Sequence, residues 1–261
     1  MKILQVDDLR TYFFTSHGAV KAVDGVNFDI EKREVFGLVG ESGSGKTLTA
    51  LSILRLIPES ARLESGKVLF NGEDMITADN DRLRSIRGAK ISIVFQEPST
   101  ALNPVFTIGY QMTEAVLAHR PIGKKKARDI AINYLGKVHI PQPEKVFGDY
   151  PHQISGGAKQ RVMIAMALMN SPELVILDEP TTALDVTIQA GILDLLDEIL
   201  EKEKVSMLFI SHDFGIISRM CDRVAVMRKG RIVEEGQTDR IINSPREPYT
   251  MSLLESVKAL L

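Results

Sequence analysis

The sequence predicts an α/β protein whose core is a parallel sheet, and three kinds of pattern support this prediction. Short apolar runs without polar alternation are typical of strands buried on both faces of a parallel sheet. Apolar residues with helical spacing appear in one clear stretch, at Ile192, Leu195, Leu196, Ile199 and Leu200. In the last part of the chain strand and helix patterns alternate, which favours parallel pairing through helical connections. The unbroken apolar runs are residues 35–39, 174–177, 207–210 and 224–227.

The first part of the chain, to about residue 72, shows strand patterns. Residues 3–9 mix apolar and polar side chains, and residues 23–30 alternate them. The stretch Lys67-Val68-Leu69-Phe70 runs into the dipeptide Asn71-Gly72, a turn signal between strands. We therefore expect several strands here, with the buried run at 35–39 among them.

The middle of the chain, at about residues 97–160, is more polar and is expected to be helical, with interruptions. A proline inside a helix removes a hydrogen bond and clashes with the preceding turn. The prolines that interrupt this part are Pro98, Pro104, Pro121, Pro141, Pro143 and Pro151.

Composition restricts the class of protein. The 261 residues carry a net charge of −2 and the pI is about 6.2, so the overall charge does not indicate a nucleic-acid partner and we expect none. The single cysteine, Cys221, excludes an internal disulfide and any multi-cysteine metal site. No run of about 18 apolar residues occurs, so no membrane-spanning segment is predicted, and the first residues lack the apolar stretch of a signal peptide. If the chain serves a membrane, we expect it to do so through a partner.

Residues 40–47 fit the P-loop pattern, in which glycines let successive backbone N–H groups point into one concavity. The helix that follows would direct its positive end at phosphate groups. Lys46 would contact the β- and γ-phosphates of a nucleotide, and the Thr47 hydroxyl would ligate Mg²⁺. A plain Gly-Ser loop is the alternative, but the buried run before the motif and the apolar stretch after it favour a P-loop. The residues expected to bind the nucleotide here are Gly40, Ser42, Gly43, Ser44, Gly45, Lys46 and Thr47.

Two carboxylates follow the apolar run at 174–177. Asp178 and Glu179 would lie at the carboxyl end of a buried strand, where α/β sheets bind ligands. Asp178 would hold Mg²⁺ directly or through water. Glu179 would act as the general base that polarises the attacking water. The alternative is a strand that ends in an acidic surface turn, and the P-loop earlier in the chain argues against it.

A third segment, Ser155-Gly156-Gly157, precedes an apolar helical stretch. Ser-Gly-Gly before a helix can form another anion-binding nest, although the same residues also make generic turns. The order and spacing of the three segments together resemble the nucleotide-binding subunit of an ABC transporter, and Ser155, Gly156 and Gly157 resemble the signature of that family. The family often has Gln at the next position, where this chain has Ala158. Because the expected phosphate contacts come from Ser155 and the two glycines, we expect activity to be retained.

The resemblance covers nearly the whole chain and implies roles for further residues. Gln96 resembles the Q-loop glutamine, which contacts Mg²⁺ or water and senses the membrane partner. Asp185, with Ala183 and Leu184 before it, resembles the D-loop. His212 resembles the switch histidine, which contacts the γ-phosphate.

The ring that stacks on adenine is left open by the resemblance. Phe13 aligns best with the aromatic residue that stacks there, but Tyr12 and Phe14 flank it. Any of the three rings could instead serve only in packing.

The fold implied by the resemblance is a P-loop NTPase of the ABC cassette type, occupying residues 1–261 as one nucleotide-binding domain. A RecA-like parallel-sheet core would carry an N-terminal antiparallel β subdomain. A helical subdomain would be inserted at about 97–160, and a short C-terminal tail would span about 237–261.

Finer resemblance points to importers of dipeptides, oligopeptides or nickel. It rests on residues 95–104, 161–168 and 178–190 and on the tail segment Pro248-Tyr249-Thr250. The chain resembles the first of the two ATPase chains that such systems usually contain. Peptides are the expected cargo, and nickel or a nickel chelate is the alternative because short members of the group include nickel importers. A non-transport ABC ATPase is a more distant alternative.

The resemblance also implies partners and a mechanism. A second ATPase subunit, a different chain or a second copy of this one, would sandwich two ATP molecules and supply its signature residues to them. Two transmembrane permease subunits would be driven by this closure, with an extracytoplasmic substrate-binding protein acting indirectly. We expect residues 97–106 to form the socket for a permease helix. The chain would then work peripherally at the cytoplasmic face of the inner membrane.

Overall fold

The structure is a computed structural model that describes residues 1–16, 18–182 and 184–258, and side chains as far as residue 255. It contains two compact units. Unit 1 comprises Met1–Leu83 and Ser206–Leu261, and unit 2 comprises Arg84–Val205.

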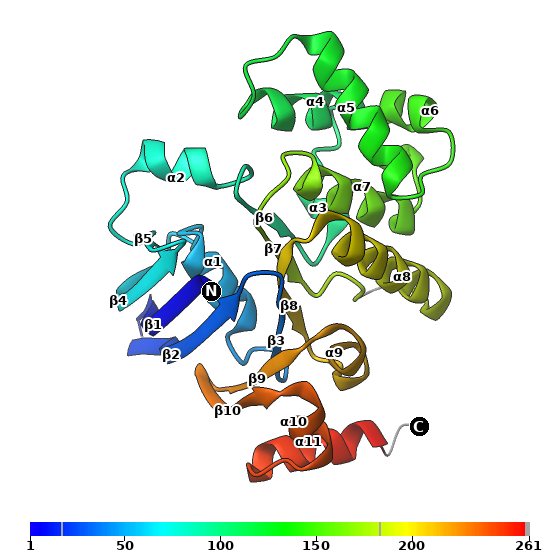
Figure 1. Cartoon of the computed structure of the whole chain (residues 1–261). Coiled ribbons are helices and arrows are strands. Elements are labelled where there is room, and N and C mark those ends of the chain that lie inside the picture. The colour runs from blue at the N-terminus through cyan, green and yellow to red at the C-terminus, as the bar shows by residue number, and fades with distance from the viewer. Residues whose placement is uncertain (17, 183, 259–261) are drawn as a thin grey trace. The chain divides into compact units, whose positions relative to one another are not determined.

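The N-terminal part of unit 1 is an antiparallel sheet with the strand order β2-β1-β4-β5 (Figure 1). Its strands are β1 (Lys2–Thr15), β2 (Gly18–Glu31), β4 (Ala61–Phe70) and β5 (Glu73–Asp74). The turn between β4 and β5 contains Asn71 at φ 49° and Gly72 at φ 85°. Two consecutive positive φ angles are typical of the tight hairpin turn that favours Asn-Gly, so the expected turn is confirmed.

A second sheet of unit 1 is parallel around β3 (Val35–Val39). Its neighbours β8 (Ser206–Ser211) and β9 (Arg223–Arg228) pair with β3 in parallel, and β10 (Arg231–Gln237) pairs with β9 antiparallel. Every residue of β3 and β8 is buried, as their unbroken apolar sequences predict. The helices of this unit include α1 (Lys46–Ile53), α9 (Phe214–Met220), α10 (Thr238–Asn243) and α11 (Pro248–Lys258).

Unit 2 contains the parallel pair β6 (Ile91–Val94) and β7 (Leu174–Asp178) and most of the helices. Helices α4 (Ile108–Leu117), α5 (Lys124–Lys137) and α6 (Pro143–Gly148) pack on one another (Figure 1, green). The other helices are α3 (Pro98–Ala101), a 3₁₀ turn (Pro151–Gln153), α7 (Gly156–Leu168) and α8 (Val186–Glu203), while α2 (Asn80–Ile86) crosses from unit 1 into unit 2.

Three of the expected proline interruptions are helix starts. Pro98, Pro143 and Pro151 each stand in the first turn of a short helix. Proline is tolerated there because the N–H groups of the first turn have no partner within the helix.

The parallel strand pairs of the two units confirm the expected α/β class with a parallel core. The boundaries expected at 97–160 and 237–261 stay predictions.

Two elements end earlier than their apolar sequences. β6 stops at Val94, before Phe95, whose side chain is exposed. Helix α1 stops at Ile53, although apolar residues continue to Ile57. Arg55 has a φ of 50°, and the Leu56 N–H donates to the Leu51 carbonyl. The helix therefore ends with one residue in the left-handed conformation, as helices commonly do.

Within the described ranges, no helix has the length and hydropathy needed to span a bilayer.

Candidate functional site

The P-loop and His212 each follow directly after a strand of unit 1, and the two strands are neighbours. Val39 is the register partner of Ser211 in the parallel pair β3–β8. Gly40 follows Val39 and His212 follows Ser211, so both continue from the carboxyl ends of adjacent strands. His212 is exposed. Ligands of α/β sheets bind at such strand ends, and the nucleotide contacts expected of these residues stay predictions.

Two P-loop glycines leave no room for a side chain. A Cβ atom at Gly40 would collide with the carbonyl oxygen of Met227, and one at Gly45 would collide with that of Ala22. Gly45 also has a φ of 110°, which L side chains rarely adopt. The Ser44 carbonyl accepts a hydrogen bond from the Gly230 N–H at 2.8 Å. The loop is therefore held against the β9–β10 hairpin by close backbone contacts.

The loop and the start of α1 have the features of an anion-binding site. Helix α1 begins at Lys46 without a side-chain cap and without an acidic residue in its first turn, so its positive end faces the loop. The buried Lys46 ammonium donates to the carbonyls of Gly40 at 2.8 Å and Glu41 at 2.9 Å. The buried Ser44 hydroxyl has no hydrogen-bond partner among the described residues. The Lys46 ammonium and the Ser44 hydroxyl are hydrogen-bond donors that suit phosphate oxygens.

The three aromatic candidates lie on different faces of β1. Thr11 and Ser52 hydroxyls are 2.8 Å apart, so Thr11 faces helix α1. Register between β1 and β4 is continuous from Thr11 to Phe13, and residues two apart in a strand point to the same face. Phe13 therefore shares the face that points to the P-loop helix. Tyr12 and Phe14 point to the opposite face.

The rings of Tyr12 and Phe14 have other contacts. The Tyr12 hydroxyl donates to Asp24 at 2.7 Å, and the Arg62 guanidinium lies 5.2 Å from the Phe14 ring centre. Asp24 is buried and also accepts from Arg231. The hydrogen bond from Tyr12 and the one from Arg231 lower the pKa of Asp24 to about 2. Tyr12 is thus held by a buried carboxylate, which leaves Phe13 as the best candidate for stacking on adenine.

In unit 2, the strand ends of β6 and β7 bring Gln96 to Glu179. Val94 and Leu177 are register partners in this parallel pair. The Gln96 amide nitrogen donates to Glu179 Oε2 at 3.0 Å. Asp178 is buried at the end of β7, and Glu179 is half-buried with a φ of 47°. Positive φ in a non-glycine residue is uncommon and is found at functional sites.

Thr182 also contacts Glu179, which was not predicted. Its hydroxyl donates to Glu179 Oε2 at 2.9 Å, and its N–H donates to the Glu179 carbonyl at 3.2 Å. The left-handed conformation of Glu179 turns the chain back and brings Thr182 to the carboxylate. The sequence signal that could have revealed this contact is a threonine three residues after the carboxylate, in a segment rich in turn-forming residues.

Ser155 begins helix α7 in the way its sequence suggests. It is the N-cap, and its hydroxyl accepts from the Ala158 N–H at 3.2 Å. Ser155 and Gly156 are exposed, while Gly157 is buried. The only hydrogen bond that the structure gives between this cap and Ala158 uses the backbone of Ala158, so the missing Gln side chain does not affect the capping.

The expected D-loop is described in part, because Ala183 lies outside the described residues. Asp185 is the N-cap of α8, and its carboxylate accepts from the Ile188 N–H at 2.9 Å. This contact gives Asp185 a structural role in addition to the nucleotide contact that the resemblance implies.

The described residues contain no preformed metal-binding cluster. No cluster of three or more His, Cys, Asp or Glu side chains that could hold a metal ion occurs there. A magnesium ion bound with a nucleotide needs only one or two carboxylates, because phosphates and water supply its other ligands. Asp178 and Gln96 in unit 2 and Thr47 in unit 1 each carry an oxygen atom of the kind that Mg²⁺ prefers.

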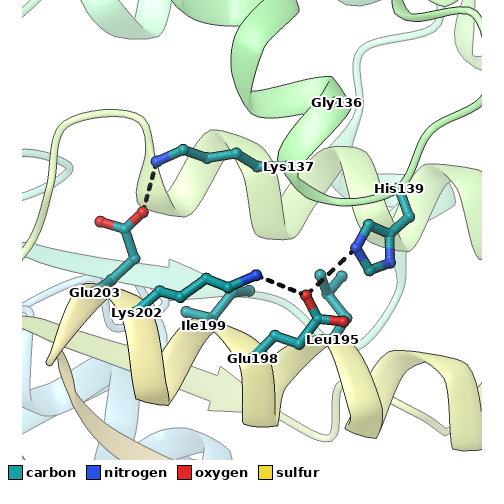
Figure 2. A pocket seen from close by; sticks show the side chains of 8 residues that line it. All are labelled: Gly136, Lys137, His139, Leu195, Glu198, Ile199, Lys202 and Glu203. Atoms are coloured by element: carbon teal, nitrogen blue, oxygen red, sulfur yellow. Dashed lines mark hydrogen bonds and ion pairs between the residues drawn. The ribbon is translucent and has the colours of Figure 1, made fainter.

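A cavity of about 290 Å³ lies elsewhere in unit 2, beside the end of α5 and the last turns of α8 (Figure 2). Its rim is formed by ion pairs, with Lys137 2.6 Å from Glu203 and Glu198 3.0 Å from Lys202. The lining contains none of the expected site residues. Exposed ion pairs of this kind contribute little free energy, and we do not assign the cavity to the site.

A family model and two similar proteins point to the same family. Residues 23–182 match the family model described as ABC transporter. The chain is 48% identical over 260 residues to the dipeptide transport ATP-binding protein DppD of Bacillus subtilis, covering 99% of this chain and 78% of that protein. It is 46% identical over 260 residues to the oligopeptide transport ATP-binding protein OppD of the same organism, covering 99% of this chain and 73% of that protein.

A solved structure shows the same fold. It is the dimeric, post-hydrolysis form of the ATP-binding cassette MJ0796 bound to ADP and Pi. The two chains superpose with a TM-score of 0.81 at 25% identity, covering 90% of this chain and 98% of the other.

Proposed function

The chain belongs to the ABC transporter family, and we propose from this premise that its hydrolysis of ATP drives the import of dipeptides or oligopeptides. The observation that carries the proposal is the similarity, at 46–48% identity over 99% of the chain, to two ATP-binding proteins named for dipeptide and oligopeptide transport. At this identity the similarity extends well beyond the motifs that every ATPase of the family needs.

The P-loop residues bind the phosphates of ATP in this proposal. Lys46 exchanges its two carbonyl acceptors for the β- and γ-phosphates, and the backbone N–H groups around Gly43 and Gly45 surround the β-phosphate. The Ser44 hydroxyl gains a phosphate partner. His212, at the end of the neighbouring strand, contacts the γ-phosphate and reports its presence.

A magnesium ion bound with ATP would be held by oxygen donors of this chain, namely the Thr47 hydroxyl, the Asp178 carboxylate and the Gln96 amide oxygen. The Gln96 nitrogen is engaged by Glu179, so the oxygen is the atom that would hold the ion. When bound, the ion would supply positive charge to offset the charge that develops on the phosphates during hydrolysis.

Glu179 is the proposed general base. Its Oε2 atom already accepts two hydrogen bonds, from Gln96 and Thr182, which fix the carboxylate in one orientation. An oriented carboxylate can accept a proton from water as that water attacks the γ-phosphate. Gln96 contacts the base directly, so a shift of the segment after β6 would also move Glu179.

The adenine ring stacks on Phe13 in this proposal, because that side chain faces helix α1. Phe13→Ala should raise the dissociation constant for ATP about tenfold, since stacking on one base is worth about 1–3 kcal/mol. Phe14→Ala is the matched control on the opposite face and should leave it unchanged. Binding of a fluorescent ATP analogue measures both. Equal effects of the two changes, or an effect of Phe14→Ala alone, would refute the assignment.

Exposed residues of unit 2 support the proposed partners. We propose that Ser155 and Gly156, exposed at the start of α7, bind the ATP held by a second ATPase subunit. Val105 is 69% exposed, and the Phe106 and Tyr110 rings stack at 4.6 Å on the surface. An apolar group of this kind suits contact with a permease helix. The chain then acts at the cytoplasmic face of the membrane.

The cargo is tested by isolating the chain from its own cells with the proteins that bind it. We expect two permease subunits and an extracytoplasmic binding protein encoded with them. Mass spectrometry of that binding protein should identify bound peptides. Bound nickel or a nickel chelate would make the chain a nickel-importer ATPase, and the absence of any permease would contradict an import function.

A further inference from the structure

A residue of the C-terminal tail contacts the P-loop, and the function proposed above gives it no role. The Tyr249 hydroxyl accepts a hydrogen bond from the Glu41 N–H at 3.4 Å, although the two residues are 208 positions apart. Both belong to unit 1. Glu41 lies between Gly40 and Ser42, so the contact falls within the phosphate-binding loop itself.

Helix α11, which carries Tyr249, is anchored to the sheet. The buried Glu234 carboxylate of β10 accepts from the Arg246 N–H at 3.0 Å and the Glu247 N–H at 3.2 Å, just before the helix. Thr250 and Leu254 are buried. A helix fixed at its start and along one face holds Tyr249 in one place.

The Tyr249 ring is also fixed from the side of β9. The Arg228 guanidinium lies 4.5 Å from the ring centre, a cation–π distance. Arg228 ends β9, and two residues later the Gly230 N–H donates to the Ser44 carbonyl of the P-loop. The loop is thus held by the hairpin at Ser44 and by the tail at Glu41.

We propose that Tyr249 is a positioning residue for the P-loop, which holds residues 40 and 41 in the conformation that binds ATP. The inference rests on the proposed function of this loop. Lys46 now donates to the Gly40 and Glu41 carbonyls. When Lys46 turns to the phosphates, these carbonyls lose that donor, and the contact with Tyr249 keeps the segment in place.

The test is Tyr249→Phe, which removes the hydroxyl and keeps the ring beneath Arg228. The dissociation constant for MgATP should rise about fivefold, as expected for the loss of one neutral hydrogen bond. The maximal hydrolysis rate of the assembled complex should stay unchanged, because the hydroxyl does not touch the reacting atoms. Tyr134→Phe, in unit 2, is the matched control and should alter neither value.

The outcomes separate this inference from the proposed function. Normal ATP binding by Tyr249→Phe, with binding weakened in Lys46→Ala, would overturn the role of Tyr249 alone. Normal binding by both variants would overturn the role of the loop. A fivefold loss in Tyr249→Phe together with a lower melting temperature would indicate a merely structural role, and it would overturn the inference as well.

Discussion

Glu179→Gln should lower the rate of ATP hydrolysis on the order of 10²- to 10⁴-fold, which is the usual contribution of a general base. The carboxamide is nearly the same size as the carboxylate, and its oxygen can still accept hydrogen bonds from Gln96 and Thr182. It cannot take a proton from water at neutral pH. ATP binding should therefore persist, and ATP should accumulate in a closed assembly with the second ATPase subunit.

Two measurements check this expectation. Phosphate release by the assembled complex gives the rate, and sedimentation with and without ATP detects the trapped assembly. Glu198→Gln is a suitable control, because Glu198 is a half-buried carboxylate of the same unit that pairs with Lys202 (Figure 2). The Glu198→Gln protein should hydrolyse ATP at the wild-type rate. Hydrolysis by Glu179→Gln at the wild-type rate would show that another group accepts the proton.

Lys46→Ala should impair function at an earlier step, by weakening the binding of ATP itself. Charge-assisted hydrogen bonds to phosphate are each worth about 1.5–3 kcal/mol. The dissociation constant should therefore rise on the order of 10- to 100-fold. Calorimetric titration with MgATP measures this value directly.

Loss of the Lys46 contacts to the loop carbonyls could also disturb folding, so the melting temperature without nucleotide needs to be compared. Lys2→Ala removes an exposed lysine of the same unit, one that pairs with Asp29 at the surface, and it should bind ATP normally. A Lys46→Ala protein that is folded and binds ATP with unchanged affinity would contradict the assignment of the P-loop.

The sequence predicts most of the site because most of it is local. The conformation of residues 40–47 depends on glycines and on the helix that follows, and both are visible in the sequence. Asp178 and Glu179 follow one buried apolar run and His212 follows another, and the carboxyl end of such a strand is where α/β sheets bind ligands. Family resemblance then supplied the roles.

Contacts that depend on the whole fold could not be predicted. Tyr249 and Glu41 are 208 residues apart, and no periodicity relates them. Thr182 contacts Glu179 where Glu179 adopts a φ of 47°, a conformation that its residue type does not favour. The choice among Tyr12, Phe13 and Phe14 needed the face of β1 that points to α1, which the Thr11–Ser52 contact reveals.

The most direct test of the central claim is peptide uptake into proteoliposomes that contain this chain, its second ATPase subunit and both permeases. With the binding protein outside and ATP inside, labelled peptide should accumulate, and peptide should raise the rate of ATP hydrolysis. The same vesicles made with Glu179→Gln should bind ATP but accumulate no peptide. Equal accumulation by wild type and Glu179→Gln, or ATP hydrolysis by the wild-type complex that no peptide stimulates, would contradict an ATPase that drives peptide import.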